Sequence, residues 1–289
     1  MRELEGKTAV ITGAASGMGR AFADRLARAN MRVVLADIEP APLHAAVAEL
    51  EAQGATALAV VTDVSKEHDM DALHARALDQ FGSVDVVCLN AGVAGGTGPM
   101  DTLTVGDWQW TLGVNLWGIV HGIRAFVPGL KRQNSGHVVI TASIAGLTSF
   151  PNMGPYNVTK HGAVAIAETL FSELRDQNSA VGVSCLCPGV VHTNIITSER
   201  NRPEALRRPL IEPERTNEDL DRGRASFEIF TTAKPPHEVA DLVHDAIVDR
   251  RFWIFTDEVF TPEILRRLDA IRDRADPTAR GTLLDVYFT

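Results

Sequence analysis

Short apolar runs rich in β-branched residues alternate along this sequence with longer amphipathic stretches, and this alternation limits the folds open to the chain. The short runs predict strands at Thr8–Thr12, Arg32–Asp37, Leu58–Val61, Val84–Leu89, His137–Thr141, Val181–Leu186 and Phe252–Thr256. The longer stretches predict helices at Met18–Ala29, Pro42–Gln53, Glu67–Gln80, Asp107–Lys131, Tyr156–Asp176, Pro236–Arg250 and Pro262–Arg274. Strands joined through helices pair in parallel by right-handed crossovers, and almost wholly apolar strands are covered on both faces. The sequence therefore predicts an α/β fold, a doubly wound parallel sheet with helices on both faces.

We expect residues 1–289 to form a single domain, because no linker separates two cores and no internal repeat occurs. The character of the chain changes after residue 190, where Arg200–Arg224 combines many charges with three prolines. We predict one or two short helices there, within a substrate loop or lid over residues 190–235, since long loops in compact domains commonly serve binding. Residues 257–289 are expected to form a C-terminal extension, whose apolar end favours packing on a neighbouring subunit.

Acidic side chains outnumber basic ones by 37 to 28, which gives a net charge of −9. Binding to nucleic-acid phosphates needs clustered Lys and Arg, so we expect no nucleic-acid partner. No apolar run approaches the roughly 18 residues of a membrane span, and the charged residues after Met1 precede no apolar signal-peptide core. We therefore expect a cytoplasmic protein without a membrane partner.

The three cysteines, Cys88, Cys185 and Cys187, are too few and too unevenly spaced for a disulfide framework. Cys185 and Cys187 share one face of a predicted strand, and we interpret them as buried thiols in a reducing compartment. The nine histidines are scattered, and neither His-Glu-x-x-His nor Cys-x-x-Cys occurs. No metal site is expected on these grounds.

A glycine-rich loop follows the first predicted strand and leads directly into a helix. It reads Thr12-Gly13-Ala14-Ala15-Ser16-Gly17-Met18-Gly19. The glycines allow a tight turn and a close approach of the backbone to a ligand, and the helix start offers free N–H groups to a pyrophosphate. This position between strand and helix predicts a dinucleotide site of the Rossmann type, bound by Gly13, Ser16, Gly17, Met18 and Gly19.

Asp37 ends the second predicted strand, where a carboxylate can accept hydrogen bonds from the ribose hydroxyls of the adenosine. The same carboxylate would repel the 2′-phosphate of NADP. The glycine loop contains no Lys or Arg, and Ile38 follows Asp37, so no cation in these segments offsets that repulsion. The sequence therefore predicts NAD as the cofactor.

Ser143, Tyr156 and Lys160 form the candidate catalytic group. Tyr156 and Lys160 are four residues apart in a predicted helix and therefore lie on one face, a turn apart. A tyrosine with a pKa near 10 is a poor base at neutral pH, but a neighbouring ammonium favours the phenolate and lowers that pKa. We expect Tyr156 to act as an acid and base, and Ser143 to hold the reacting oxygen beside it.

Together these motifs resemble the short-chain dehydrogenase/reductase family in its single-domain form. The resemblance covers about residues 6–195 and the helix and strand around 236–256. The matching pieces are Thr12-Gly13-x-x-x-Gly17-x-Gly19, Asp63-Val64, Asn90-Ala91-Gly92, Asn115, Ser143, Tyr156-x-x-x-Lys160, Pro188-Gly189 and Thr193. The chain departs from the family where Leu89 replaces a frequent Asn, and we expect Leu89 to point into the sheet packing.

The resemblance also implies roles for individual residues. Asp63 and Val64 would contact the adenine, and Asn90, Ala91 and Gly92 would line the adenosine side of the cleft. Asn115 would hold a water that links Lys160 to solvent, and Lys160 would also bind the nicotinamide ribose. The remaining cofactor contacts implied are Tyr156, Pro188, Gly189, Val191 and Thr193.

Substrate contacts are expected after Ser143, before Tyr156 and after Pro188, at the carboxyl ends of the strands. The residues there are mostly apolar, which favours a bulky hydrophobic alcohol or ketone of steroid, terpenoid or aryl type. They are Ile144, Ala145, Leu147, Phe150, Pro151, Met153, His192, Asn194, Ile195 and Ile196.

His192 is either a polar contact or an exposed loop residue. The arginines at 200, 202, 207 and 208 either meet an acidic substrate or, as we favour, pair with Glu199, Glu204, Glu212 and Glu214.

Three other functions were weighed against a dehydrogenase. A hydrolase lacks support because no Gly-x-Ser-x-Gly occurs. A nucleotide-sugar epimerase or dehydratase would use a similar Tyr and Lys but needs a larger substrate domain. A non-catalytic NAD-binding protein of the same fold is a third alternative.

The resemblance finally implies a homo-oligomer, a tetramer or dimer, with helices 107–131 and 156–176 at its interfaces. Trp108, Trp110 and Trp117 serve either those contacts or the core.

Overall fold

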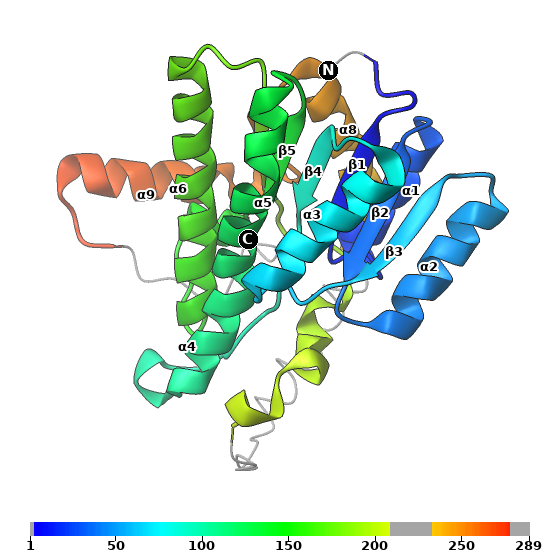
Figure 1. Ribbon diagram of the computed structural model, residues 1–289. Helices are drawn as coiled ribbons and strands as arrows, with labels where there is room; N and C mark the ends of the chain where they lie inside the picture. The colour runs from blue at the N-terminus through cyan, green and yellow to red at the C-terminus, as the bar shows by residue number, and fades with distance from the viewer. Residues whose placement is uncertain (1–2, 209–232, 278–289) are drawn as a thin grey trace.

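The computed structural model describes residues 3–208 and 233–277 of the chain, and in them seven parallel strands form one sheet (Figure 1). The strand order is β3-β2-β1-β4-β5-β6-β7, with every neighbouring pair parallel. The strands are β1 (Thr8–Thr12), β2 (Arg32–Asp37), β3 (Ala57–Val61), β4 (Val86–Leu89), β5 (His137–Thr141), β6 (Gly182–Cys187) and β7 (Trp253–Phe255). The predicted doubly wound parallel sheet is confirmed, and every predicted strand is present within two residues of its expected bounds.

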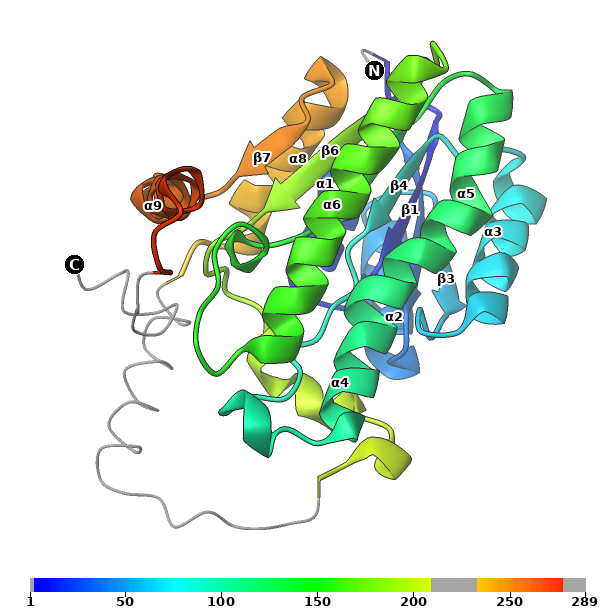
Figure 2. The same cartoon turned by 90° about the vertical axis from the view of Figure 1, so that its left-hand side faces the viewer.

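The α-helices that the structure describes connect these strands and follow the last one. They are α1 (Gly17–Arg28), α2 (Pro40–Ala52), α3 (Glu67–Phe81), α4 (Val105–Leu112), α5 (Gly118–Arg132), α6 (Gly154–Asp176), α8 (Pro236–Asp249) and α9 (Thr261–Asp273). Helices α3, α5 and α6 cover one face of the sheet, and α1, α2 and α8 cover the other (Figure 2). Because both faces are covered, the central strands β1, β4 and β5 are buried along their whole length.

The two faces carry two separate apolar cores. Side chains of α3, α5 and α6, among them Met70, Phe126 and Leu170, pack on one face. Those of α1, α2 and α8, such as Phe22 and Leu43, pack on the other. Leu89 contributes to the first core and is 3% exposed, as expected from the sequence. The cores hold the strand ends in register, and the loops after those ends carry the site.

The helix predicted over Asp107–Lys131 is present without interruption over residues 105–132, but it is not regular throughout. The segment contains α4, then the π-helical turn η2 (Gly113–Trp117), and then α5. The wider turn inserts one residue into the helical repeat, which the hydrophobic pattern of the sequence does not reveal. Asn115, placed by the sequence in the middle of a regular helix, lies in this turn.

The segment after β6 begins with short 3₁₀ helices, η4 (Asn194–Asn201) and η5 (Glu204–Leu206). They agree with the prediction of one or two short helices in the charge-rich segment. The remainder of that segment, and the apolar tail at Leu283, Leu284, Val286, Tyr287 and Phe288, lie outside the described residues. None of the helices in the described ranges is long and apolar enough to cross a membrane.

Candidate active site

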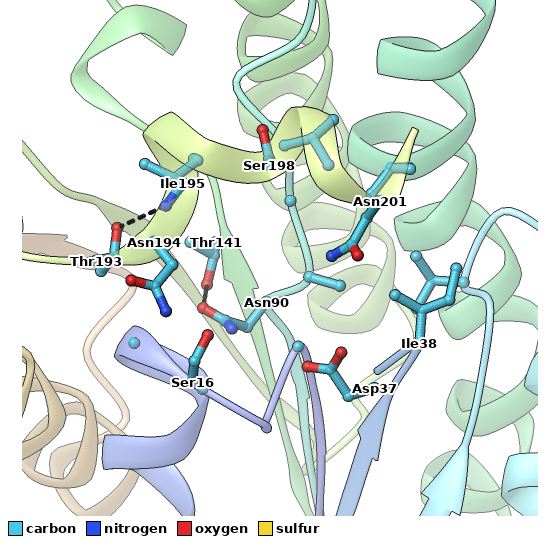
Figure 3. Close-up of a pocket in the computed structure, with 18 of the residues that line it drawn as sticks. Ser16, Asp37, Ile38, Asn90, Thr141, Thr193, Asn194, Ile195, Ser198 and Asn201 are labelled. Atoms are coloured by element: carbon cyan, nitrogen blue, oxygen red, sulfur yellow. Dashed lines mark hydrogen bonds between the residues drawn. The ribbon is translucent and has the colours of Figure 1, made fainter. Parts of the chain in front are cut away.

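A cleft opens at the carboxyl ends of the strands, where the order of the sheet reverses between β1 and β4. Chain connections diverge at such a switch point, which leaves a crevice above the strand ends. The space inside measures about 1160 Å³ with its open mouth included. Helix η4 passes over the strand ends, so the cleft has a roof (Figure 3).

The glycine loop between β1 and α1 forms the floor of this cleft. Gly13 and Gly17 adopt positive φ angles of 68° and 56°, which favour glycine. A Cβ on Gly13 would lie 2.9 Å from the Ala91 Cα, and a Cβ on Gly19 would collide with the Gly13 carbonyl. The loop therefore approaches the β4 end as closely as backbones can, and the start of α1 faces the cleft. Ser16, Gly17, Met18 and Gly19 all line it.

Asp37 lies at the end of β2, and its carboxylate is oriented by two backbone donors. The Ala15 N–H donates to Oδ2 at 2.9 Å and the Glu39 N–H to Oδ1 at 3.1 Å. Burial raises the pKa of this carboxyl, and the Ala15 and Glu39 hydrogen bonds act in the opposite direction. Asp37 is thereby attached to the glycine loop and faces the cleft.

The end of β4 is joined to β1 and β5 by side-chain hydrogen bonds. The Thr12 hydroxyl accepts from the Asn90 and Ala91 N–H groups at 2.9 and 3.1 Å. The Asn90 amide donates to the Thr12 carbonyl at 3.0 Å and accepts from the Thr141 hydroxyl at 3.2 Å. Asn90, Ala91 and Gly92 line the cleft as predicted, and these bonds fix their position between the two neighbouring strands.

Tyr156, near the start of α6, lies in the cleft opposite the end of β5. Its hydroxyl is hydrogen-bonded to Ser143, which also accepts from the Ala145 N–H at 3.1 Å. Burial raises the pKa of Tyr156, and the Ser143 hydrogen bond only partly opposes this. The net shift is therefore opposite in direction to the lowering of the Tyr156 pKa expected from the sequence. The spacing of the two residues in the sequence contains no information about how deeply the phenol is buried.

Lys160 lies one turn further along α6 and is 3% exposed. Its ammonium donates to the Thr141 carbonyl at 2.9 Å and lies 5.6 Å from the centre of the Tyr156 ring. Burial lowers the pKa of Lys160 to about 8. The ammonium and the phenol therefore lie together in one low-dielectric space, where each proton depends on the other.

Asn115 is held by the backbone next to Gly92. Its amide donates to the Val93 carbonyl at 3.0 Å, and its carbonyl oxygen accepts from the Val93 N–H at 2.8 Å. A third, longer contact of 3.3 Å joins the amide to the Thr159 hydroxyl on α6. The π-turn η2 thus connects the β4 loop with the helix that carries Tyr156 and Lys160.

The other predicted cofactor residues divide into two groups. Asp63, Val64, Pro188 and Thr193 line the cleft. Asn115, Ser143, Gly189 and Val191 lie behind its surface. Of these, the Gly189 N–H donates to the Thr256 hydroxyl at 2.9 Å, and Val191 is 5% exposed.

Most of the predicted substrate contacts do not line the cleft. Asn194 and Ile195 do, but Ile144, Ala145 and Phe150 are buried in the core, and His192 and Ile196 face solvent. Leu147 and Met153 pack against the core, and Pro151 is exposed. Ile144 and Ala145 were misplaced because the loop after β5 turns back into a 3₁₀ helix under α6. Further residues line the cleft that were not predicted from the sequence, and these are Ile38, Glu39, Thr62, Ser65, Val93, Trp110, Val114, Thr141, Ala142, Ser198, Asn201 and Pro203.

The arginines after residue 199 pair within the chain, but mostly with other partners than predicted. Arg202 is buried and pairs with Asp107 at 2.8 Å as well as with the predicted Glu199 at 3.0 Å. Arg208 also donates to Asp107, and Arg200 pairs with Glu39. The predicted partners Glu212 and Glu214 lie outside the described residues. Arg202 is also buried, and its guanidinium lies 5.2 Å from the Trp110 ring.

Residues 7–204 match the short chain dehydrogenase family. The chain belongs to this family. Among its curated relatives, a CLA biosynthesis dehydrogenase/reductase of Lactiplantibacillus plantarum is 31% identical over 94% of this chain and 95% of its own. A 1-deoxy-11-beta-hydroxypentalenate dehydrogenase of Streptomyces exfoliatus is 36% identical over 88% of this chain and 84% of its own.

A solved short-chain dehydrogenase/reductase from Burkholderia phymatum, in complex with NAD, has the same fold with a TM-score of 0.91. It is 42% identical and covers 97% of this chain and 99% of its own. As a member of the short chain dehydrogenase family, the protein is an oxidoreductase, and this confirms the class of enzyme predicted from its motifs.

Proposed function

We propose that this protein is an NAD-dependent oxidoreductase that interconverts a secondary alcohol and a ketone, with Tyr156 as the acid and base. The observation that carries the proposal is that one cleft contains both halves of the required machinery. Asp37 and the glycine loop lie at the β1 and β2 ends, and Tyr156 and Lys160 lie at the β5 end. The two groups come from opposite sides of the switch point, as an extended dinucleotide requires.

The residues present fit NAD. The loop at Gly13 and Gly19 leaves a cradle that a Cβ would fill, next to the N-terminus of α1. Asp37 presents an oriented carboxylate to a ribose and opposes a 2′-phosphate. Asp63 and Val64 line the same end, where an adenine would lie. The similar structure from Burkholderia phymatum contains NAD, which supports this choice.

The catalytic step assigned to the chain is a proton transfer at the Tyr156 hydroxyl. The bound nicotinamide supplies the acceptor or donor of the hydride. During oxidation the Tyr156 oxygen takes the proton of the substrate hydroxyl, and during reduction it returns a proton to the carbonyl oxygen. Ser143 holds the substrate oxygen at this position, since its hydroxyl already contacts Tyr156.

Lys160 and Asn115 support that proton transfer. The ammonium of Lys160 lies 5.6 Å from the Tyr156 ring centre and favours the phenolate when the hydroxyl loses its proton. We also propose that Lys160 binds a hydroxyl of the nicotinamide ribose. Asn115 fixes the loop at Val93 by two hydrogen bonds, and we propose that it holds a water that connects Lys160 with solvent.

We further propose that the substrate is bulky and hydrophobic, of steroid, terpenoid or aryl type. The apolar side chains that line the cleft include Val93, Trp110, Val114, Ile195 and Pro203. The name of the Streptomyces exfoliatus relative, a 1-deoxy-11-beta-hydroxypentalenate dehydrogenase, fits an alcohol on a large carbon skeleton. Helix η4 supplies Ile195 and Ser198, which supports the segment from residue 190 onward as a substrate loop.

The competing functions are less well supported. Relatives that match over nearly their whole length have names of dehydrogenases or reductases, not of epimerases or dehydratases. A non-catalytic NAD-binding protein would not need Tyr156 and Lys160 in the cleft with Ser143 next to the phenol. For assembly we propose a homodimer or homotetramer through α5 and α6. Trp117, the last residue of η2 directly before α5, is 53% exposed, and Val158 on α6 is 47% exposed. Sedimentation equilibrium that shows a monomer would contradict this assembly.

A screen of hydrophobic secondary alcohols tests the function. The purified protein is mixed with each alcohol and with either NAD or NADP, and the absorbance of the reduced nicotinamide is followed. We expect at least one bulky alcohol to be oxidised with NAD much faster than with NADP. Faster turnover with NADP would contradict the role of Asp37, and Asp37→Ala is expected to reduce the preference for NAD.

A further inference from the structure

The adenosine end of the cleft contains an ion pair that the family motifs do not include. Arg200, from η4 in the roof, pairs with Glu39 at the start of α2. The Arg200 Nε donates to Glu39 Oε1 at 3.1 Å, and Nη2 donates to Oε2 at 2.6 Å. Such a two-point contact between guanidinium and carboxylate is among the strongest side-chain pairings. Both residues line the cleft.

The remaining donors of Arg200 are also engaged. Its Nη1 donates to the Thr197 carbonyl at 3.0 Å, to the Thr197 hydroxyl at 3.1 Å and, at a longer 3.4 Å, to the Asn194 carbonyl. The guanidinium is thus held from both edges. On the other side of the pair, the hydrogen bond from Arg200 is the largest cause that lowers the pKa of Glu39. Glu39 is therefore ionised and bound to Arg200 at neutral pH.

The pair lies beside the carboxylate proposed to select NAD. The Glu39 N–H donates to Asp37, and the two residues are separated only by Ile38. Asp37, Ile38 and Asn201, the neighbour of Arg200, lie at the same end of the cleft (Figure 3). Among the described residues that line the cleft, the cations are Lys160 and Arg200, and Lys160 lies at the opposite end beside Tyr156. Arg200 is thus the cation available to a phosphate near Asp37.

From this arrangement we propose that Glu39 is a second determinant of cofactor choice, because it binds the guanidinium of Arg200 and withholds it from the 2′-phosphate of NADP. Asp37 repels that phosphate, and Glu39 removes the cation that would attract it. The inference rests on the proposed preference for NAD. It adds that the preference needs two carboxylates and that Arg200 can bind a phosphate once Glu39 no longer holds it.

Titration calorimetry tests this inference by measuring the affinity for NADH and for NADPH in a series of variants, and it requires no turnover. The starting point is Asp37→Asn, which removes the direct repulsion but leaves Arg200 paired. Adding Glu39→Gln is expected to raise the affinity for NADPH by roughly tenfold, the size of a hydrogen-bonded contact to a charged group. Adding Arg200→Gln to that double variant is expected to abolish the gain.

Two controls separate this effect from others. Glu49→Gln removes the same charge from α2, where Glu49 pairs with Arg20 outside the cleft, and it is expected to leave the NADPH affinity unchanged. Arg200→Gln in the Asp37→Asn background breaks the same pair as Glu39→Gln without freeing a cation. If breaking the pair merely loosened η4 over the cleft, the affinity for NADPH would therefore change equally in both variants, and the affinity for NADH would change as well.

The outcomes are distinct. No gain with Glu39→Gln, or a gain that persists after Arg200→Gln, overturns the inference while the proposed function stands. A wild-type protein that binds NADPH more tightly than NADH instead overturns the preference for NAD on which the inference rests.

Discussion

Lys160 and Tyr156 define the chemistry of this cleft at the level of single residues. Burial affects them in opposite directions, since it lowers the pKa of Lys160 to about 8 and raises the pKa of Tyr156. As the pH rises, the first proton lost by the pair therefore leaves near pH 8. Because the two groups share one buried space, that pKa belongs to the pair.

Alcohol oxidation is therefore expected to increase as the pH rises through about 8, because the pair must be able to accept the substrate proton. In Lys160→Met the increase is expected to move to higher pH, since the buried phenol then loses its neighbouring cation. Initial rates across the pH range check this with saturating NAD and alcohol. A flat wild-type profile between about pH 6 and 10 would contradict it.

The residue types at the site could be predicted from the sequence, but their electrostatics could not. The spacing of Tyr156 and Lys160 correctly places both on one face of α6. It does not reveal that the Lys160 ammonium reaches the Thr141 carbonyl, or that burial dominates the pKa of Tyr156. It also gives no sign that Glu39 and Arg200, distant in the chain, meet at the cleft. Such contacts depend on which loops the fold brings together.

The π-turn η2 is the element that ties the β4 loop to α6. Asn115→Leu keeps the approximate volume of the side chain but leaves the buried N–H and C=O of Val93 without their partner. We expect a loss of about 2–5 kcal/mol in the free energy of unfolding, since each unpaired buried group costs about 1–3 kcal/mol. Urea unfolding measures this, with the exposed Gln177→Leu as the control. Equal stability of the two variants would contradict the role of Asn115.

Asp107 on α4 holds the chain that follows η4 against this helix. This fully buried carboxylate accepts from Thr104, Arg202 and Arg208. These hydrogen bonds outweigh its burial and lower its pKa to about 2. Asp107→Ala is expected to cost about 3–5 kcal/mol, because it removes the buried partner of Arg202 and leaves that buried charge with only the exposed Glu199.

The matched control for that substitution is Asp79→Ala. Asp79 pairs with Arg76 at 3.3 Å on the surface of α3, where an ion pair contributes only about 0–1 kcal/mol. Urea unfolding of both variants gives the comparison. Equal losses in the two would show that the Asp107 cluster does not hold the segment in place. The sequence indicated ion pairs in this region, but the burial of Arg202 against Trp110 could be seen only in the structure.

At the scale of the whole molecule, His137 makes the free energy of unfolding depend on pH. It is the first residue of β5, at the end of the strands opposite the cleft. Its Nε2 donates to the Ser184 hydroxyl at 2.8 Å, since that hydroxyl donates to the Arg251 carbonyl. Burial lowers the pKa of His137 from its ordinary 6.5 to about 3. The unfolded chain therefore binds a proton below pH 6.5 that the folded chain does not bind until about pH 3.

Stability is consequently expected to fall as the pH decreases below 6.5. The contribution of this one residue amounts to about 2 kcal/mol between pH 6.5 and 5. Urea unfolding at both pH values, for the wild type and for His137→Gln, isolates it. The wild type is expected to lose about 2 kcal/mol more than the variant, and identical losses would exclude His137 as the cause.

The overall fold was predictable because the alternation of strands and helices is a local signal that the packing then satisfies. β1, β2 and β5 have the predicted bounds, and the strand ends bring Gly13, Asp37 and Asn90 together as the topology requires. The π-helical turn at η2 and the inward turn of Ile144 were not predictable, since the hydrophobic pattern of the sequence carries no signal for either.

The proposed function depends above all on Tyr156 as the residue that carries the proton in the reaction. The most direct measurement compares the turnover and NADH affinity of Tyr156→Phe with those of Tyr287→Phe, which changes the only other tyrosine in the chain. We predict that Tyr156→Phe loses roughly 10²–10⁴-fold in turnover and binds NADH as the wild type does, while Tyr287→Phe keeps its activity. A Tyr156→Phe enzyme with near wild-type turnover would contradict the account.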